Sequence, residues 1–296
     1  ILRELVEHPF FEPDGITPRW TSPMTSFAMG MATWLLHDSL SVETRDLVRG
    51  YLIDKANHWA AQAPKDSYIT DTGAEENSWR AELLALTGLL YSDDPASPSW
   101  LAKAETYAYH TLTVPPDPPF GGYDTQTLHP GYLLENHGWL PHLSYLMAAS
   151  VGPLGQGAAL FSKRGLSVPN GFSHNVALAW GAHEPYLDPS TFLLRDCGMA
   201  NTYGGKDDWG NDGTSFDSGF AYLDNLQGTS WLDAVSEFHF RIRYGLNFFP
   251  RDAPVPIYGG RPRYSFVMRR FMNSVSAFRH AMALLQKDPS LTLPTP

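Results

Sequence analysis

The chain alternates long apolar stretches of helical periodicity with segments rich in proline, glycine and aspartate, and this alternation constrains its fold most. The clearest stretch is Ala74–Tyr91, in which Leu83, Leu86 and Leu90 recur at spacings of three and four residues. That repeat places side chains on one face of a helix, so it predicts an amphipathic helix. Further helices are expected at Met24–His37, Val42–Ala63, Ser99–Leu112, Phe172–His183, Asp217–Leu226, Trp231–Tyr244 and Phe266–Gln286, and another begins near Leu140.

About ten helices of moderate length, joined by loops that alternate between short and long, are typical of stacked helical hairpins. The sequence shows no fixed period of the kind that marks a solenoid of identical repeats. We therefore expect an all-α fold in which residues 1–296 form a single α/α toroid (barrel) domain. Its long loops would meet at one end and form a cleft.

The first residue, Ile1, reads as the middle of an element, so the expected ring of helices is incomplete at the N-terminus. The same end lacks the basic, apolar and cleavage regions of a signal peptide. This is compatible with a cytoplasmic protein and with the mature form of a secreted one. The sequence leaves both the location and the oligomeric state open.

The charge balance excludes some classes of partner. The chain has 21 basic and 31 acidic residues, a formal net charge of −10, which argues against a nucleic-acid-binding surface. Its single cysteine, Cys197, rules out an intrachain disulfide. The sequence contains neither an apolar run of transmembrane length nor a glycine-rich nucleotide loop. We therefore expect no membrane span and no cofactor.

A first polar motif, Asp71–Asn77, opens the helix that the clearest periodic stretch predicts. Thr72 and Glu75 match a capping box, which accounts for Glu75 without any functional role. Glu76 and Asn77 have no such explanation, so we take Glu76 as a candidate catalytic acid and Asn77 as a candidate substrate-binding residue. The alternative for Glu76 is a surface pair with Arg80, four residues further along the helix.

A second motif, Glu135–Gly138, precedes the helix that Pro141 introduces. A helix N-terminus lowers the pKa of a nearby histidine, so His137 is a candidate general base and Glu135 a candidate catalytic carboxylate. The alternative is a histidine that caps the loop. The same loop region supplies the candidate substrate-binding residues Tyr123, His129, Tyr132 and Asn136. Its histidine spacing matches no zinc pattern, so we expect no metal site.

The third motif is the acidic, glycine-flanked segment Lys206–Asp212. Asp208 is a candidate catalytic carboxylate, and Trp209 is a candidate sugar-binding platform because an aromatic face packs against sugar C–H groups. The adjacent carboxylates also suit calcium, although the spacing is not that of an EF-hand loop. A solvated acidic turn is the structural alternative.

At these motifs the chain resembles bacterial proteins of the α/α-toroid superfamily. That superfamily includes six-hairpin glycosidases and uronate lyases of the alginate-lyase and heparinase kind. The resemblance rests on A-E-E-N-S-W at Ala74–Trp79, E-N-H-G at Glu135–Gly138 and K-D-D-W at Lys206–Trp209, and it covers about half of the chain, Asp71–Asp212.

The resemblance implies two kinds of glycosidic bond cleavage. In the lyases an Asn neutralises the uronate carboxylate, a His or Tyr removes the C5 proton and a Tyr protonates the leaving oxygen. Asn136, His137 and either Tyr132 or Tyr123 match those roles. In the glycosidases two carboxylates act, and the candidates are Glu76, Glu135 and Asp208. The expected substrate is therefore a glycan or another small molecule, and hydrolysis is favoured slightly because acidic residues are plentiful and basic ones sparse.

Two other classes remain open from the sequence. Helical barrels with aromatic pockets also house terpenoid dehydratases, isomerases and cyclases, in which an acid protonates an olefin and aromatic faces stabilise the cation. A closed apolar pocket with one acid favours that class. A non-catalytic sugar-binding or scaffolding protein is the third possibility.

Overall fold

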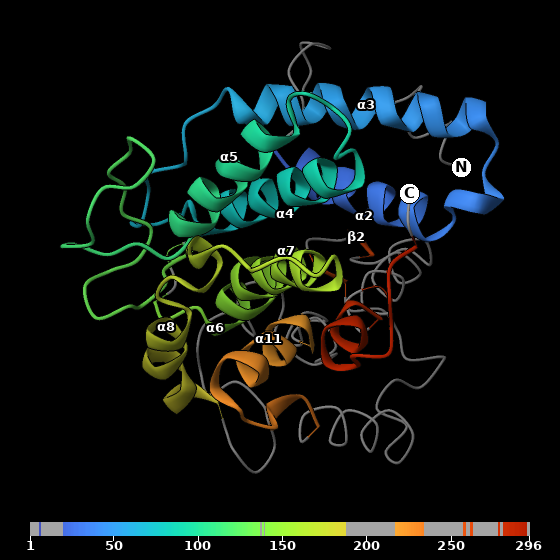
Figure 1. Cartoon of the computed structure of the whole chain (residues 1–296). Coiled ribbons are helices and arrows are strands. Elements are labelled where there is room, and N and C mark those ends of the chain that lie inside the picture. Colours follow the sequence, from blue (N-terminus) through green and yellow to red (C-terminus); the bar gives the residue numbers. More distant parts are fainter. Residues whose placement is uncertain are drawn as a thin grey trace.

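A computed structural model describes residues 20–136, 138, 140–187, 217–233 and 281–294, together with residues 6, 257–258, 261–262 and 278. This part of the chain is mostly helical and its helices pack directly on one another (Figure 1), which confirms the predicted helical class. A short antiparallel pair, β1 (Ile257–Tyr258) and β2 (Arg261–Pro262), accompanies the helices.

The described helices follow the predicted order closely. In chain order the α-helices are α2 (Ser22–Leu35), α3 (Val42–Ala60), α4 (Ala74–Leu90), α5 (Ser97–Tyr109), α6 (Leu143–Tyr145), α7 (Gly152–Lys163), α8 (Val176–His183) and α11 (Asp217–Gln227). The short 3₁₀-helices among the described residues are η1 (His37–Ser39), η3 (Asn170–Ser173) and η4 (Glu184–Tyr186), and η2 (Leu146–Val151) is a π-helix. Residues 281–287 form a further helical stretch. Every helix among the described residues is too short or too polar to cross a bilayer.

Several predicted boundaries need correction. Helix α2 covers Ser22–Leu35 and not Met24–His37, α8 begins at Val176 and not at Phe172, and the helix expected from near Leu140 begins at Leu143. Helix α3 ends at Ala60, although the sequence predicted a helix up to Ala63, because the amide of Gln62 turns back to Trp59 and closes the last turn. Helix α5 begins at Ser97 and not at Ser99, because Pro98 is accommodated in the first turn, where no intrahelical amide is required.

Helix α4 lies at the centre of the fold and is more deeply buried than an amphipathic helix. It packs against α2, α3, α5, α7 and η2 (Figure 1), and every one of its residues except Glu76 is buried. The close approach to α5 depends on Gly88, because a Cβ there would lie 2.6 Å from the Leu101 side chain. The predicted amphipathic face is therefore only part of a fully enclosed helix.

The helices α6, η2 and α7 form one continuous run. This run contacts α4 at the point where the run's own backbone hydrogen bonds are interrupted. Pro153 has no amide, so it cannot donate to the carbonyl of Ala149 as an α-helix requires. The run widens into the π-helical η2 just before this proline. The Ala149 carbonyl instead lies 2.6 Å from the hydroxyl of Ser78 on α4, which fixes α7 against the first turns of α4.

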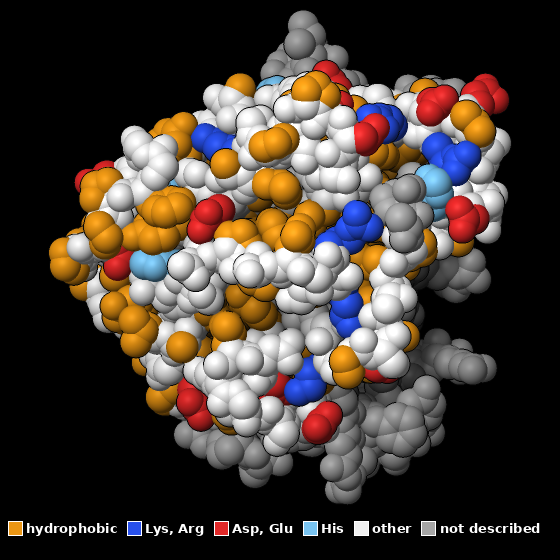
Figure 2. Space-filling model, in the orientation of Figure 1, with side chains coloured by type: hydrophobic (Ala, Val, Ile, Leu, Met, Phe, Trp, Pro, Cys, Tyr) orange, Lys and Arg blue, Asp and Glu red, His pale blue; other side chains and the backbone are white. Residues whose placement is uncertain are grey.

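Helices α7 and α11 form a second group, below α2–α5 in Figure 1. The segment 281–294 joins the two groups, because Trp34 Nε1 on α2 donates to the Pro294 carbonyl at 2.7 Å. On the face shown in Figure 2, lysine and arginine side chains stand singly among acidic and hydrophobic ones.

The loops 61–73 and 110–142 meet at the end of the bundle where α4 begins (Figure 1). Thr72 Oγ1 donates to the Thr127 carbonyl at 2.7 Å, and the Gln126 amide donates to Asp66 Oδ1 at 2.8 Å. Polar residues that are far apart in the sequence are thereby gathered at one end of a buried helix.

Candidate functional site

Most described residues of the first two polar motifs lie together at the start of α4. The Thr70 amide donates to Glu135 Oε1 at 2.9 Å, and the Thr72 amide donates to Asn136 Oδ1 at 3.2 Å. Glu75 and Glu76 follow in the first turn of the helix. We call the five residues Glu75, Glu76, His129, Glu135 and Asn136 the acid cluster.

The start of α4 differs from the predicted capping box. Gly73 is the N-cap, and it makes no side-chain capping bond. Thr72 Oγ1 accepts from the Ala74 amide at 3.1 Å and donates into the neighbouring loop. Among the described residues, Glu75 makes no return bond to the helix start. Capping therefore does not account for Glu75, contrary to the interpretation from sequence.

Glu75 is a buried acid, with 4% of its surface exposed. Burial raises its pKa to about 9, and the nearby charges of Glu76 and Asp71 add to the rise. The carboxyl group is consequently protonated at neutral pH. Sequence reasoning missed this residue because a familiar local pattern already explained it.

Glu76 is the one residue of α4 that is not fully buried, with 13% of its side chain exposed. Burial of its carboxyl group raises its pKa, and Lys65, whose Nζ lies 4.0 Å from Oε1, opposes that rise. Its second oxygen, Oε2, is buried and has no hydrogen-bond partner among the described residues. The surface pair with Arg80 is not formed, because that guanidinium lies over the Trp59 ring, 4.5 Å from its centroid.

Glu135 is held at both carboxylate oxygens. Oε1 accepts the Thr70 amide, and Oε2 lies 2.6 Å from Nε2 of His129. The His129 ring also meets the edge of Tyr68, with centroids 5.1 Å apart. The turn that carries His129 is closed by Tyr132, whose amide donates to the His129 carbonyl and whose φ is +66°. Two of the predicted binding residues therefore shape the loop around Glu135.

Thr70 has a strained backbone beside this carboxylate. Its φ is +66°, a left-handed conformation that costs a residue with a Cβ about 1–2 kcal/mol. The Glu135 carboxylate holds its amide, and the Gly138 amide donates to its carbonyl at 2.8 Å. Backbone strain of this kind concentrates at functional sites.

The two asparagines of the motifs have different surroundings. Asn77 accepts the Lys65 amide and donates to the Lys65 and His110 carbonyls, so its amide group is engaged with the backbone. Asn77 therefore connects the start of α4 to two loops, and its contact with substrate stays a prediction. Asn136 is equally buried, yet its Nδ2 finds no partner among the described residues.

An aromatic platform lies one helical turn further along α4. Trp20, which is 48% exposed, stacks on Trp79 with ring centroids 5.6 Å apart and an angle of 27°. Trp79 stands one helical turn after Glu75, so the exposed ring covers the face of α4 that carries the buried acid. The indole Nε1 of Trp79 is a further buried donor without a partner among the described residues.

The predicted residue Tyr123 belongs to a neighbouring set of residues. The sequence analysis did not identify this set. Its hydroxyl accepts from Lys103 Nζ at 2.9 Å, and its ring meets the edge of His110. The set, here called the histidine network, contains Asn77, Tyr109, His110, Asp117, Tyr123, Thr125, His174 and Asn175. It lies at the same end of the helices because Asn77 binds the carbonyl of His110.

In the histidine network, Asp117 Oδ2 accepts from the Val114 amide, from Asn175 Nδ2 at 2.7 Å and from His174 Nε2 at 3.2 Å. His110 donates from Nε2 to the Phe120 carbonyl and accepts at Nδ1 from Thr125. Burial lowers the pKa of His110, which favours its neutral form.

His183 fixes the backbone just before Glu135. Its Nδ1 donates to the Ala179 carbonyl at 2.8 Å, so its Nε2 is free to accept the Leu134 amide at 3.1 Å. Burial lowers the pKa of His183 to about 4, which keeps the ring neutral, and the bond to the Ala179 carbonyl fixes the tautomer. A histidine on α8 therefore positions the loop that carries the candidate carboxylate.

Some predicted residues lie outside the described part of the chain: His137, Asp208, Trp209 and Cys197. Among the residues that are described, no group of three His, Cys, Asp or Glu side chains is arranged to hold a metal ion. Comparisons of the chain with protein-family models, with curated proteins and with solved structures give no match.

Proposed function

We propose that this chain is a carbohydrate-active enzyme that cleaves glycosidic bonds, by hydrolysis in preference to β-elimination, with the acid cluster as its catalytic site. The proposal includes the finer fold expected from sequence, a single α/α toroid over residues 1–296. One observation carries it: α4 is buried everywhere except at Glu76, whose raised pKa and unpaired Oε2 suit a proton donor.

Glycosidases need two carboxyl groups in different environments, one that keeps a proton and one that accepts. Glu76 is the proposed general acid, because burial raises its pKa and its exposed edge is reachable. Glu135 is the proposed base or nucleophile, since its oxygens accept from a backbone amide and a histidine. Asp208 remains a third proposed carboxylate.

Glu75 has a supporting role in this proposal. It is protonated at neutral pH, so it adds no negative charge beside Glu76 when the general acid gives up its proton. The unpaired Nδ2 of Asn136 is the proposed donor to a sugar hydroxyl. The exposed Trp20 is the proposed platform for a sugar ring, a task for which sequence reasoning had chosen Trp209.

Hydrolysis is preferred because the described acid cluster has one nearby lysine, Lys65, at 4.0 Å from Glu76. A uronate lyase needs several donors that neutralise a carboxylate, and in the described part of the acid cluster the candidates are the Lys65 ammonium and the unpaired Nδ2 of Asn136. His137 is retained as the proposed base for the elimination route. The terpenoid alternative gains no support, because the described residues that line a hollow between α7, α11 and the segment 168–173 include no acidic residue.

The test compares Glu76→Gln with Glu75→Gln over a panel of neutral glycans and uronate polymers. Glu76→Gln should lower the rate of sugar release about 10²–10⁴-fold, because the general acid is lost. Glu75→Gln is the matched control: it replaces a neutral acid with a neutral amide and should retain most of the activity at neutral pH. Reducing-end assays report hydrolysis, and the ultraviolet absorbance of an unsaturated uronate reports elimination. Near-normal sugar release from Glu76→Gln and Glu135→Gln would reject the proposal.

A further inference from the structure

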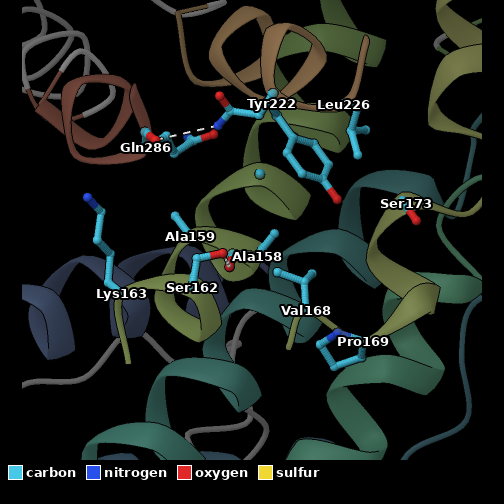
Figure 3. Close-up of a pocket in the computed structure, with 12 residues that line it drawn as sticks. Ala158, Ala159, Ser162, Lys163, Val168, Pro169, Ser173, Tyr222, Leu226 and Gln286 are labelled. Carbon is cyan, nitrogen blue, oxygen red and sulfur yellow. Dashed lines mark hydrogen bonds between the residues drawn. The ribbon is translucent and has the colours of Figure 1, made fainter. Parts of the chain in front are cut away.

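A hollow of about 270 Å³ lies beside α7, away from the acid cluster. Helix α7, helix α11, the segment 168–173 and the 281–287 stretch surround it (Figure 3). None of the residues proposed for glycan cleavage lines it. Its volume is just below the usual range for ligand pockets, about 300–1,000 Å³, so it suits a small ligand.

Gly155, which lines the hollow, lets α11 pack closely against α7. A Cβ at this position would lie 2.6 Å from Cβ of Tyr222 and 3.1 Å from Oε1 of Gln286. The Asn225 side chain donates to the Gln286 backbone carbonyl at 3.5 Å and connects α11 to the 281–287 stretch (Figure 3). The walls are therefore fixed by packed helices.

Two buried polar atoms of the hollow have no partner among the described residues: the Tyr222 hydroxyl and Gln286 Oε1. Tyr222 is 5% exposed, and its ring extends from α11 across the hollow with the hydroxyl toward the side of Val168 and Ser173 (Figure 3). A buried hydroxyl without a partner costs folding free energy. Its retention inside a hollow points to a ligand that completes the hydrogen bond.

The rest of the lining determines the class of ligand. Ala158, Ala159, Val168 and Pro169 give apolar walls, and no carboxylate lines the hollow among the described residues. The ammonium group of Lys163, at the rim, donates to the Asp288 and Leu291 carbonyls and does not need a ligand anion.

We infer that this hollow is a binding site for a small uncharged molecule with an apolar body and a hydroxyl group, which the Tyr222 hydroxyl recognises. The site is separate from the acid cluster, and it does not depend on the function proposed for that cluster.

The first experiment is an NMR titration of the full chain with three probes that share one ring: benzyl alcohol, toluene and benzoate. Benzyl alcohol should bind most tightly. Tyr222→Phe should weaken it about fivefold, the effect of one neutral hydrogen bond, and leave toluene unchanged. Tyr91→Phe is the matched control, because the Tyr91 hydroxyl is also buried and unpaired but lies outside the hollow; it should change nothing.

The second experiment fills the hollow. Ala159→Leu should abolish binding of all three probes while circular dichroism and glycan cleavage stay unchanged, and Ala102→Leu on the exposed side of α5 should bind them normally. Equal affinity for toluene and benzyl alcohol, preference for benzoate, no binding by the wild type, or an equal effect of Tyr91→Phe would each overturn the inference. Loss of glycan cleavage in Ala159→Leu would overturn the separation of the two sites.

Discussion

The acid cluster and the histidine network lie at the same end of the helices, yet their polar atoms are paired to different degrees. In the histidine network, the described residues leave no buried polar side-chain atom without a partner. In and beside the acid cluster, Glu76 Oε2, Asn136 Nδ2 and Trp79 Nε1 are buried and unpaired within the described residues.

This difference separates a structural network from a candidate site. A fully paired network stabilises the loops that it joins, and its loss costs free energy of unfolding. Unpaired buried groups lower stability and persist where they serve something else. Both regions contain a left-handed residue, Thr70 beside the acid cluster and Asn175 in the histidine network, but asparagine tolerates this conformation better than threonine. The comparison therefore predicts that mutations in one region change stability and mutations in the other change activity.

The largest expected effect is the pH dependence caused by Glu75. Its ordinary pKa of 4.5 rises to about 9 on folding, so the folded chain holds one more proton between those pH values. The contribution of Glu75 to the free energy of unfolding is therefore most favourable below pH 4.5 and falls as pH rises toward 9. The loss is about 1.4 kcal/mol per pH unit.

Glu75→Gln removes this slope, because the amide does not titrate. Denaturant unfolding of the wild type and the variant across this pH range should give a stability difference that grows in favour of the variant as pH rises. Parallel curves for the two proteins would show that Glu75 is an ordinary, solvated carboxylate.

The next largest effect is a loss of stability in the histidine network, whose polar atoms are paired. Asn77→Ala removes the partner of the Lys65 amide and of the Lys65 and His110 carbonyls. Leaving these backbone groups unpaired should lower the free energy of unfolding by about 3 kcal/mol. Urea unfolding measures this loss. Activity per folded molecule should stay near that of the wild type, and a specific loss of activity would move Asn77 into the site.

Asn136→Ala is the counterpart on the unpaired side. It loses one bond, from the Thr72 amide, and also removes an unpaired buried donor. The two changes oppose each other, so stability should remain within about 1 kcal/mol of the wild type. The rate of glycan cleavage should fall at least about tenfold if Nδ2 contacts the transition state. A stability loss as large as that of Asn77→Ala would show that both asparagines have a structural role.

The positions of the helices could be predicted from the sequence because periodicity and proline are local signals. Helix α4 was expected at Ala74–Tyr91 and is found at Ala74–Leu90. Its complete burial could not be predicted, because that depends on which helices surround it. The pattern of Thr72 and Glu75 predicted a helix cap, but the Thr72 hydroxyl donates its hydrogen bond to the Thr127 carbonyl in the neighbouring loop.

The candidate site was predicted only where the motif itself carries the chemistry. Glu76, Glu135 and Asn136 were selected from sequence, and the structure brings them to one end of α4. The partnership of Asp117 with His174, which are 57 residues apart, has no sequence signal. Asn77 and Asn136 also look alike in sequence, because the difference between them is the set of backbone groups that the fold places around each.

The smallest expected effect tests whether the strain at Thr70 is part of the site. Thr70→Gly removes a left-handed cost of about 1–2 kcal/mol but adds a backbone entropy cost of about 0.5–1 kcal/mol. The free energy of unfolding should therefore rise by up to about 1.5 kcal/mol, whereas Thr70→Ala keeps the strain and should bring no such gain. Thermal unfolding of both variants measures the difference. Because the amide of residue 70 still reaches Glu135 in either variant, the relaxed glycine should lower activity only through a looser carboxylate. A gain in stability with unchanged activity would mean that the strain belongs to the turn alone, and equal stability of the two variants would mean that it is absent.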